Sequence, residues 1–159
     1  MPTTYREIEE SLVAQIAALD ASAHAQGGSA AWRESRVPLS VVMDPSSLSH
    51  LLFNVWVQRA PVSPLGSRQG EIAGEVYLRA TLVVAFSYRL RATNQVADAR
   101  AATDAAVDVT RAVMASGAAG DALVVFVDGL NPALALDGEW QLVTQTYEVH
   151  FDLALSRST

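Results

Sequence analysis

The chain has 159 residues, half of them apolar, with a formal net charge of −6 and no cysteine. This length and composition predict a single globular domain, residues 1–159, and the lack of cysteine excludes disulfides, thiol catalysis and thiolate metal sites. All eleven basic residues are arginines that form no cluster, which argues against a surface for duplex nucleic acid. No apolar run approaches the ~20 residues of a membrane-spanning helix, and the polar first ten residues do not suggest a signal peptide.

The first predicted element is an amphipathic helix over residues 4–19. Thr4 and Glu7 have the spacing of a capping box. Apolar residues then recur at helical intervals and define one stripe: Ile8, Leu12, Ile16 and Leu19. Residues 21–31, which include two adjacent glycines, are expected to form a loop.

Two strands are predicted next, over residues 36–43 and 51–58, because apolar and polar side chains alternate in both. Asp44 and Pro45 favour a turn between them, so a β-hairpin is the simplest interpretation. Trp56 shares a strand face with polar neighbours, and two interpretations stay open for it. It is either a partly buried sheet residue or a contact between subunits.

Residues 60–74 interrupt the pattern with three glycines and two prolines. A connection of this length within one domain is usually either functional or simply flexible. Both interpretations stay open. The polar side chains Arg68, Gln69 and Glu71 lie between the glycines.

The clearest pattern covers residues 75–91, where apolar and mostly polar residues alternate without interruption. This predicts a strand much longer than the usual ~5–6 residues, with a well-fixed register. A helix follows, capped by Thr93 or Asn94 and ended by Gly117 and Gly120. Its buried stripe is expected to contain Val96, Ala99, Thr103, Ala106, Val107, Thr110, Val113 and Met114.

Two more strands complete the pattern. Residues 123–127 are apolar on both faces, which predicts a central strand that is covered on both sides. Residues 129–138 are expected to form a loop. The closing strand covers residues 143–155, and a change of phase at its start predicts a bulge near Leu142.

The predicted order is therefore α-β-β-β-α-β-β, an α+β fold. We expect a mostly antiparallel mixed sheet of about five strands with both helices packed on one face. Two of the strands are unusually long. Their ends are expected to project beyond the compact body, where they could pair with a neighbouring subunit.

Residues with the potential for chemistry are few. His24, His50 and His150 have no acidic residue at ligand spacing, so they are interpreted as surface histidines and not as metal ligands. Asp98, Asp104 and Asp108 lie on the second helix with Arg100 and Arg111, and they are interpreted as a solvated helix face. An acidic surface presented to a partner is the alternative. Neither a nucleophile elbow nor a phosphate-binding loop occurs in the sequence. The sequence thus predicts no catalytic residue, cofactor or metal.

Five segments together resemble the tail terminator (tail completion) proteins of long-tailed bacteriophages. They are residues 5–19, residues 37–57, the run VYLRATLVVAFSYRLRATNQVADARAATDAAVDVTRAVMA, then ALVVFVDGL and QTYEVHFDLAL. A long strand that ends in arginine and leads into an alanine-rich helix is similar to that family, as is a closing strand that runs almost to the C-terminus. The resemblance is architectural and covers most of the chain, without a short signature motif or catalytic residues.

The resemblance implies a hexameric ring at the head-proximal end of the phage tail tube, assembled in the bacterial cytoplasm and retained in the virion tail or neck. One face would bind the tail tube protein and stop its polymerisation, and the other would dock the head–tail connector. No cofactor, membrane or nucleic-acid sequence recognition is implied. The candidate axial contacts are Arg68, Gln69, Glu71, Asn131 and Asp137, and the candidate ring contacts are Trp56, Arg79 and Arg89.

Other functions stay open. A different neck or head–tail connector protein would be distinguished by its binding partner. A small ligand-binding domain or enzyme would be indicated by a deep pocket lined with converging polar groups. A prophage-derived injection system or gene-transfer particle would keep the mechanism and change only the setting.

Overall fold

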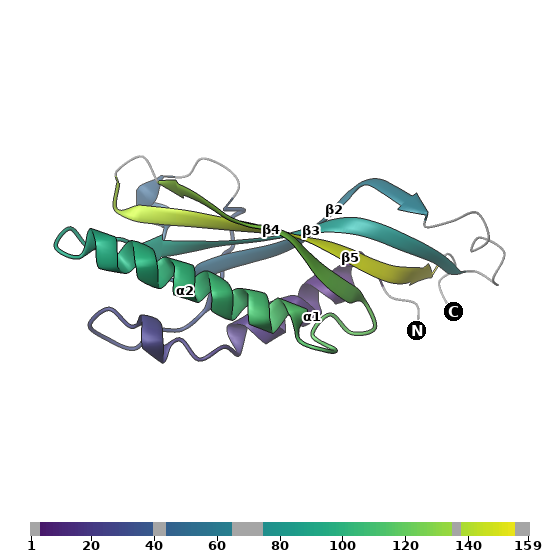
Figure 1. Ribbon diagram of the computed structural model, residues 1–159, viewed down its shortest axis with the longest axis horizontal. Coiled ribbons are helices and arrows are strands. Elements are labelled where there is room, and N and C mark those ends of the chain that lie inside the picture. Colours follow the sequence, from purple (N-terminus) through teal and green to yellow (C-terminus); the bar gives the residue numbers. More distant parts are fainter. Residues whose placement is uncertain (1–3, 40–43, 65–74, 135–137, 155–159) are drawn as a thin grey trace.

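The computed structural model describes residues 4–39, 44–64, 75–134 and 138–154 (Figure 1). Two α-helices are present in these residues, α1 (Tyr5–Ala17) and α2 (Gln95–Met114), together with the 3₁₀ turns η1 (Ser22–His24) and η2 (Pro45–Ser47). The strands are β1 (Arg33–Glu34), β2 (Leu52–Pro64), β3 (Glu75–Arg89), β4 (Leu123–Leu134) and β5 (Trp140–Ala154).

The described strands form one sheet in the order β1-β2-β3-β5-β4. β1 pairs with β2 in parallel, and the other neighbours are antiparallel. Both helices lie on the same face of the sheet, and one end of β2, β3 and β5 extends past them (Figure 1). The predicted α+β fold, with its mixed sheet and helices on one face, is confirmed.

Helix α1 begins where the sequence predicts. The Thr4 hydroxyl accepts a hydrogen bond from the Glu7 backbone N–H at 3.2 Å, and the Glu7 carboxylate accepts one from the Thr4 N–H at 2.7 Å. These two bonds satisfy donors that a helix start leaves without partners. Its apolar stripe is buried against the sheet through Ile8, Leu12 and Ile16.

Strand β3 forms the centre of the sheet. Its even-numbered side chains from Leu78 to Tyr88 are buried on the helical face, as the alternation predicts. Its register with β5 is continuous from Glu75 opposite Ala154 to Arg89 opposite Trp140. The core between sheet and helices therefore rests on two long strands that are paired along their whole length.

The predicted hairpin of residues 36–43 and 51–58 is wrong. The strand that accompanies β2 is β1, two residues long and parallel to it, while residues 36–39 are not in a strand; residues 40–43 lie outside the described part. The physical reason is that this segment crosses to the second face of the sheet, where Leu39 is buried against Ala85. The side chain of Asn54, and not a strand ladder, holds its backbone.

Helix α2 has its N-cap at Asn94, one of the two predicted residues, although the Asn94 side chain makes no capping hydrogen bond. The predicted stripe is largely wrong. The described structure buries small residues instead, with Ala106 and Val113 shared by both sets: Asp98, Ala102, Ala105, Ala106, Val109, Ala112 and Val113. Val96, Val107 and Met114 are exposed. Alanines face the sheet because the helix lies so close to β5 that the Gln145 amide donates to the Ala106 carbonyl at 2.8 Å.

Strand β4 was predicted to be central and is instead the outermost strand on its side of the sheet, because β5 inserts between it and β3. It also continues through residues 129–134, which were predicted to be a loop. The irregularities in this pair lie on β4, at Phe126/Asp128 and Gly129/Asn131. No bulge occurs near Leu142. Trp140 and Leu142 are out of phase because they pack on the second face of the sheet.

Candidate interaction surfaces

Among the described residues, the face of the sheet opposite the helices is covered at one end. The covering segment, residues 35–39 and 44–49, packs Leu39 and Leu48 against Ala85 and Trp140. The Asn54 side chain fixes this segment, because its Oδ1 accepts from the Leu39 N–H at 2.7 Å and its Nδ2 donates to the Ser35 carbonyl at 3.1 Å.

The rest of this face carries polar and charged side chains from β3 and β5. Arg79 Nε lies 3.8 Å from Glu148 Oε2, and His150 Nε2 lies 2.6 Å from Glu148 Oε1. Thr81 and Thr146 lie on the same face by strand alternation. We call this region the open face. It combines an exposed arginine, Arg79, with a half-buried glutamate, Glu148.

The three predicted ring residues, Trp56, Arg79 and Arg89, all lie on this second face by their strand register. Trp56 is half-buried against the Leu39 cluster, which agrees with a partly buried sheet residue. Arg79 belongs to the open face. Arg89 is exposed at the end of β3, where its backbone N–H donates to His50 Nδ1 at 3.2 Å. Their contacts with a neighbouring subunit stay a prediction.

The predicted axial residues are not brought together in the described structure. Arg68, Gln69, Glu71 and Asp137 lie outside the described residues. Asn131 was expected in a loop and is instead a residue of β4, paired with Thr144 of β5. A loop at Asn131 is thus wrong, because hydrogen bonding to β5 continues to Leu134.

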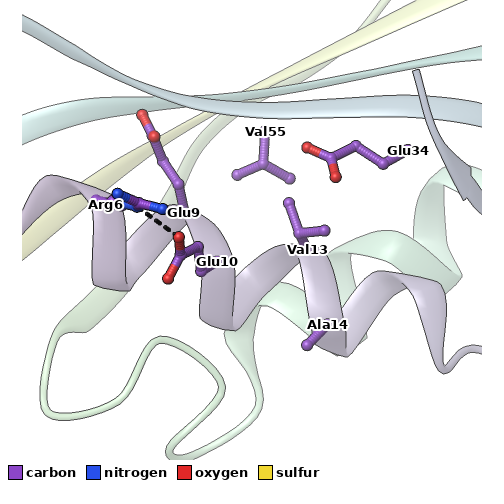
Figure 2. A pocket seen from close by; sticks show the side chains of 7 residues that line it. All are labelled: Arg6, Glu9, Glu10, Val13, Ala14, Glu34 and Val55. Atoms are coloured by element: carbon purple, nitrogen blue, oxygen red, sulfur yellow. Dashed lines mark hydrogen bonds and ion pairs between the residues drawn. The ribbon is translucent and has the colours of Figure 1, made fainter. Parts of the chain in front are cut away.

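The outer edge of β2 is protected beyond the end of β1. Glu9 reaches from α1 to the sheet (Figure 2), and its Oε1 accepts a hydrogen bond from the Val57 N–H at 2.9 Å. A groove of about 450 Å³ lies there, lined by Arg6, Glu9, Glu10, Val13, Ala14, Glu34 and Val55. Arg6 pairs with Glu10 at 2.6 Å. The arrangement satisfies a backbone donor that an edge strand would otherwise leave free.

The opposite side of the sheet is different. β4 pairs with β5 on its inner side, and no described strand pairs with its outer side. Four consecutive apolar residues of β4 are more exposed than residues of a core strand. Val124 is half-buried, and Val125, Phe126 and Val127 are exposed. The ring of Phe126 packs edge-on against Tyr147 with 5.5 Å between centroids.

One of the three histidines is not a surface residue, contrary to the prediction, and the other two, His50 and His150, are half-buried. His24 is buried, with Nε2 3.0 Å from Asp108 Oδ2 and its ring packed edge-on against Trp32 and Tyr88. His50 Nε2 lies 2.7 Å from the His24 carbonyl. Burial of His50 lowers its pKa. These contacts tie η1 to α2 and β3, and they involve partners far apart in sequence, so no local pattern could have revealed them.

Asp98 in the first turn of α2 is buried and bound to Arg91, so its predicted place on a solvated helix face is wrong. The carboxylate accepts from the Arg91 backbone N–H at 2.8 Å and from its guanidinium at 2.8 and 3.1 Å. These hydrogen bonds hold the pKa of Asp98 below its usual value. The pair connects the end of β3 to the start of α2, which is a structural task.

The described residues contain no group of three or more His, Asp or Glu side chains that could hold a metal ion. Among them, neither helix is long and apolar enough to cross a membrane. Comparison with known protein families finds no family that matches the chain. Comparison with curated proteins finds no significant match either.

Proposed function

We propose that this protein is a structural assembly protein that forms a closed ring, caps the head-proximal end of a phage tail tube and presents the docking surface for the head connector. The observation that supports the proposal is the extension of β2, β3 and β5 past the helical layer (Figure 1). The sheet there runs on without helical cover. Extended strands of this kind suit contacts with a neighbouring subunit.

A ring requires heterologous contacts, in which two different surfaces of the subunit meet. The arm, which consists of the ends of β2 and β3 at residues 59–64 and 75–77, provides one surface. The open face with Arg79 and Glu148 provides the other. If the arm of each subunit contacts the open face of the next, and the contact is repeated by rotation, the subunits close a ring. Such a ring would block further tube subunits without any chemical step.

The function is tested by disabling the gene in the phage or prophage that encodes it and imaging the particles by negative-stain electron microscopy. Overlong tubes without heads are the expected result. Tubes of normal length that fail to join heads would assign the protein to the connector side of the neck. Complete virions would overturn the structural role.

The surface assignment is tested by complementing the same strain with Arg79→Glu. Reversing this charge is expected to impair ring closure and to restore few particles. Arg100→Glu is the matched control, because Arg100 is an exposed arginine on α2, away from the open face. Equal complementation by both variants would show that the open face is not a ring contact.

A further inference from the structure

Strand β4 presents an exposed apolar surface on a sheet edge with which none of the other described strands pairs. The exposed fractions are 60% for Leu123, 41% for Val125, 40% for Phe126 and 58% for Val127. An edge strand also leaves every second backbone N–H and C=O pointing away from the sheet. Exposed apolar side chains and free backbone groups in one segment form a template for another strand.

The charges around this segment favour a particular arrangement. Residues 122–127 contain no charged side chain, and Asp121 and Asp128 flank them. An in-register parallel pair would place Asp128 beside its own copy, and like charges opposite each other are unfavourable. An antiparallel pair centred on Val125 places Asp128 opposite Ala122 and Asp121 opposite Gly129 of the other strand, so no two aspartates are directly opposite. The charge pattern therefore favours the antiparallel over the in-register parallel direction.

The two edges of the sheet also indicate which strand of a second molecule could pair with β4. On the other side of the sheet β2 is covered by β1 and by the Glu9 carboxylate. A second molecule of this chain therefore offers a bare apolar edge of the same kind from its own β4. Contact between two such edges uses the same residues on both sides, which is an isologous contact about a two-fold axis.

We propose that β4 of one molecule pairs antiparallel with β4 of a second copy, across a two-fold axis close to Val125. The two five-stranded sheets then continue into one another. The pairing belongs to the free protein and goes beyond the ring proposed above. A two-fold contact does not by itself build a closed ring of more than two subunits, so each proposal can fail without the other.

The chain has no cysteine, so a single introduced thiol reports on this contact without interference. Opposite residues of an antiparallel pair have Cα atoms about 4.5–5.5 Å apart. This lies within the range of about 4.4–6.8 Å that a disulfide spans. Single cysteines at positions 123 to 126 of the full chain are oxidised and analysed by non-reducing electrophoresis. Disulfide dimer is expected to be most abundant for Val125→Cys or an adjacent position.

Val96→Cys is the matched control, because Val96 is also an exposed valine but lies on α2. It is expected to give no dimer above collisional background. Cross-linking at β4 no greater than at Val96 would overturn the proposal.

Sedimentation velocity over a concentration series gives an independent measurement. The unmodified chain is expected to shift from monomer to dimer as its concentration rises. Val125→Lys places two like charges near the axis and is expected to weaken dimerisation at least tenfold, while Val96→Lys leaves it unchanged. Circular dichroism checks that both variants are folded. A monomer at every concentration, or a larger ring that Val125→Lys disrupts, would contradict two-fold pairing.

Discussion

The two sides of the sheet meet their surroundings in different ways. On the β2 side, β1, the covering segment and the Glu9 carboxylate satisfy outward backbone groups and bury Trp32 and Leu39. On the β4 side, Val125 and Val127 are exposed on an edge with which no described strand pairs. An edge strand risks pairing with other chains unless it is covered or charged. Within the described residues, the β2 edge is therefore covered by its own chain as far as Val57, whereas no described strand covers the β4 edge.

The largest loss of stability is expected from truncating a buried core residue on the β2 side of the sheet. Trp32 packs edge-on against Phe86 with 5.3 Å between ring centroids and is almost fully buried. Trp32→Ala is expected to lower the free energy of unfolding by about 3–5 kcal/mol, measured by urea denaturation.

Phe126→Ala is the matched truncation of an aromatic residue on the β4 side of the sheet. Phe126 is exposed and keeps one ring contact, with Tyr147. A loss of about 1 kcal/mol is expected. Equal losses for Trp32→Ala and Phe126→Ala would break the comparison, because both sides would then contribute alike to stability.

A smaller effect is expected at the residue that fixes the covering segment. Asn54→Ala removes the partners of the Leu39 N–H and the Ser35 carbonyl. We expect unfolding free energy to fall by about 1–3 kcal/mol, since hydrogen-bonding groups are left without partners. Asn94→Ala is the control, because the Asn94 side chain makes no capping bond. If the two variants unfold alike in urea, Asn54 does not hold the segment.

Removal of the carboxylate that covers the β2 edge should have a more local effect. Glu9→Ala is expected to cost about 1 kcal/mol and to accelerate hydrogen exchange of the Val57 amide. Glu10→Ala removes an exposed ion pair with Arg6 and is expected to leave the Val57 amide unchanged. Unchanged exchange in Glu9→Ala would show that the edge is protected by something other than this carboxylate.

The smallest effect is expected from pH. His50 accepts from the Arg89 N–H and is bound to the His24 carbonyl, and burial lowers its pKa in the folded state. The unfolded chain therefore takes up this proton first, at about pH 6.5. Stability should fall as pH drops below that value and level off below the folded pKa. His50→Gln should flatten this slope between pH 7 and 5, and an unchanged slope would assign it to other groups.

Local sequence patterns were sufficient to predict the features that depend on residues within one helix or strand. Thr4 and Glu7 defined the start of α1, and uninterrupted alternation defined β3 and its buried face. Both depend on neighbours within a few residues. The α+β class and the order of elements followed from the same patterns.

Features set by the neighbours of an element were not predictable in this way. Five apolar residues in a row are equally compatible with a central strand and with an edge that binds a partner, so the position of β4 could not be read from residues 123–127. The face of α2 depended on how closely the helix approaches β5, which favours alanine over valine at the contact. His24 and Asp108, 84 positions apart, are brought together only by the finished fold.

The position of β5 has a consequence for synthesis. It follows β4 in the chain and yet lies between β3 and β4, so until β5 has been made β4 has no neighbour among the described strands and β3 has only β2. Glu75, for example, can pair with Ala154 only after Ala154 has been synthesised. While the ribosome is still translating β5, the edge of β3 that β5 will occupy stays available to other chains, whereas β2 can already pair with its other edge. Pairing over such separations is slow and prone to aggregation, so yield in the host should depend on chaperones that shield β3 until translation passes Ala154.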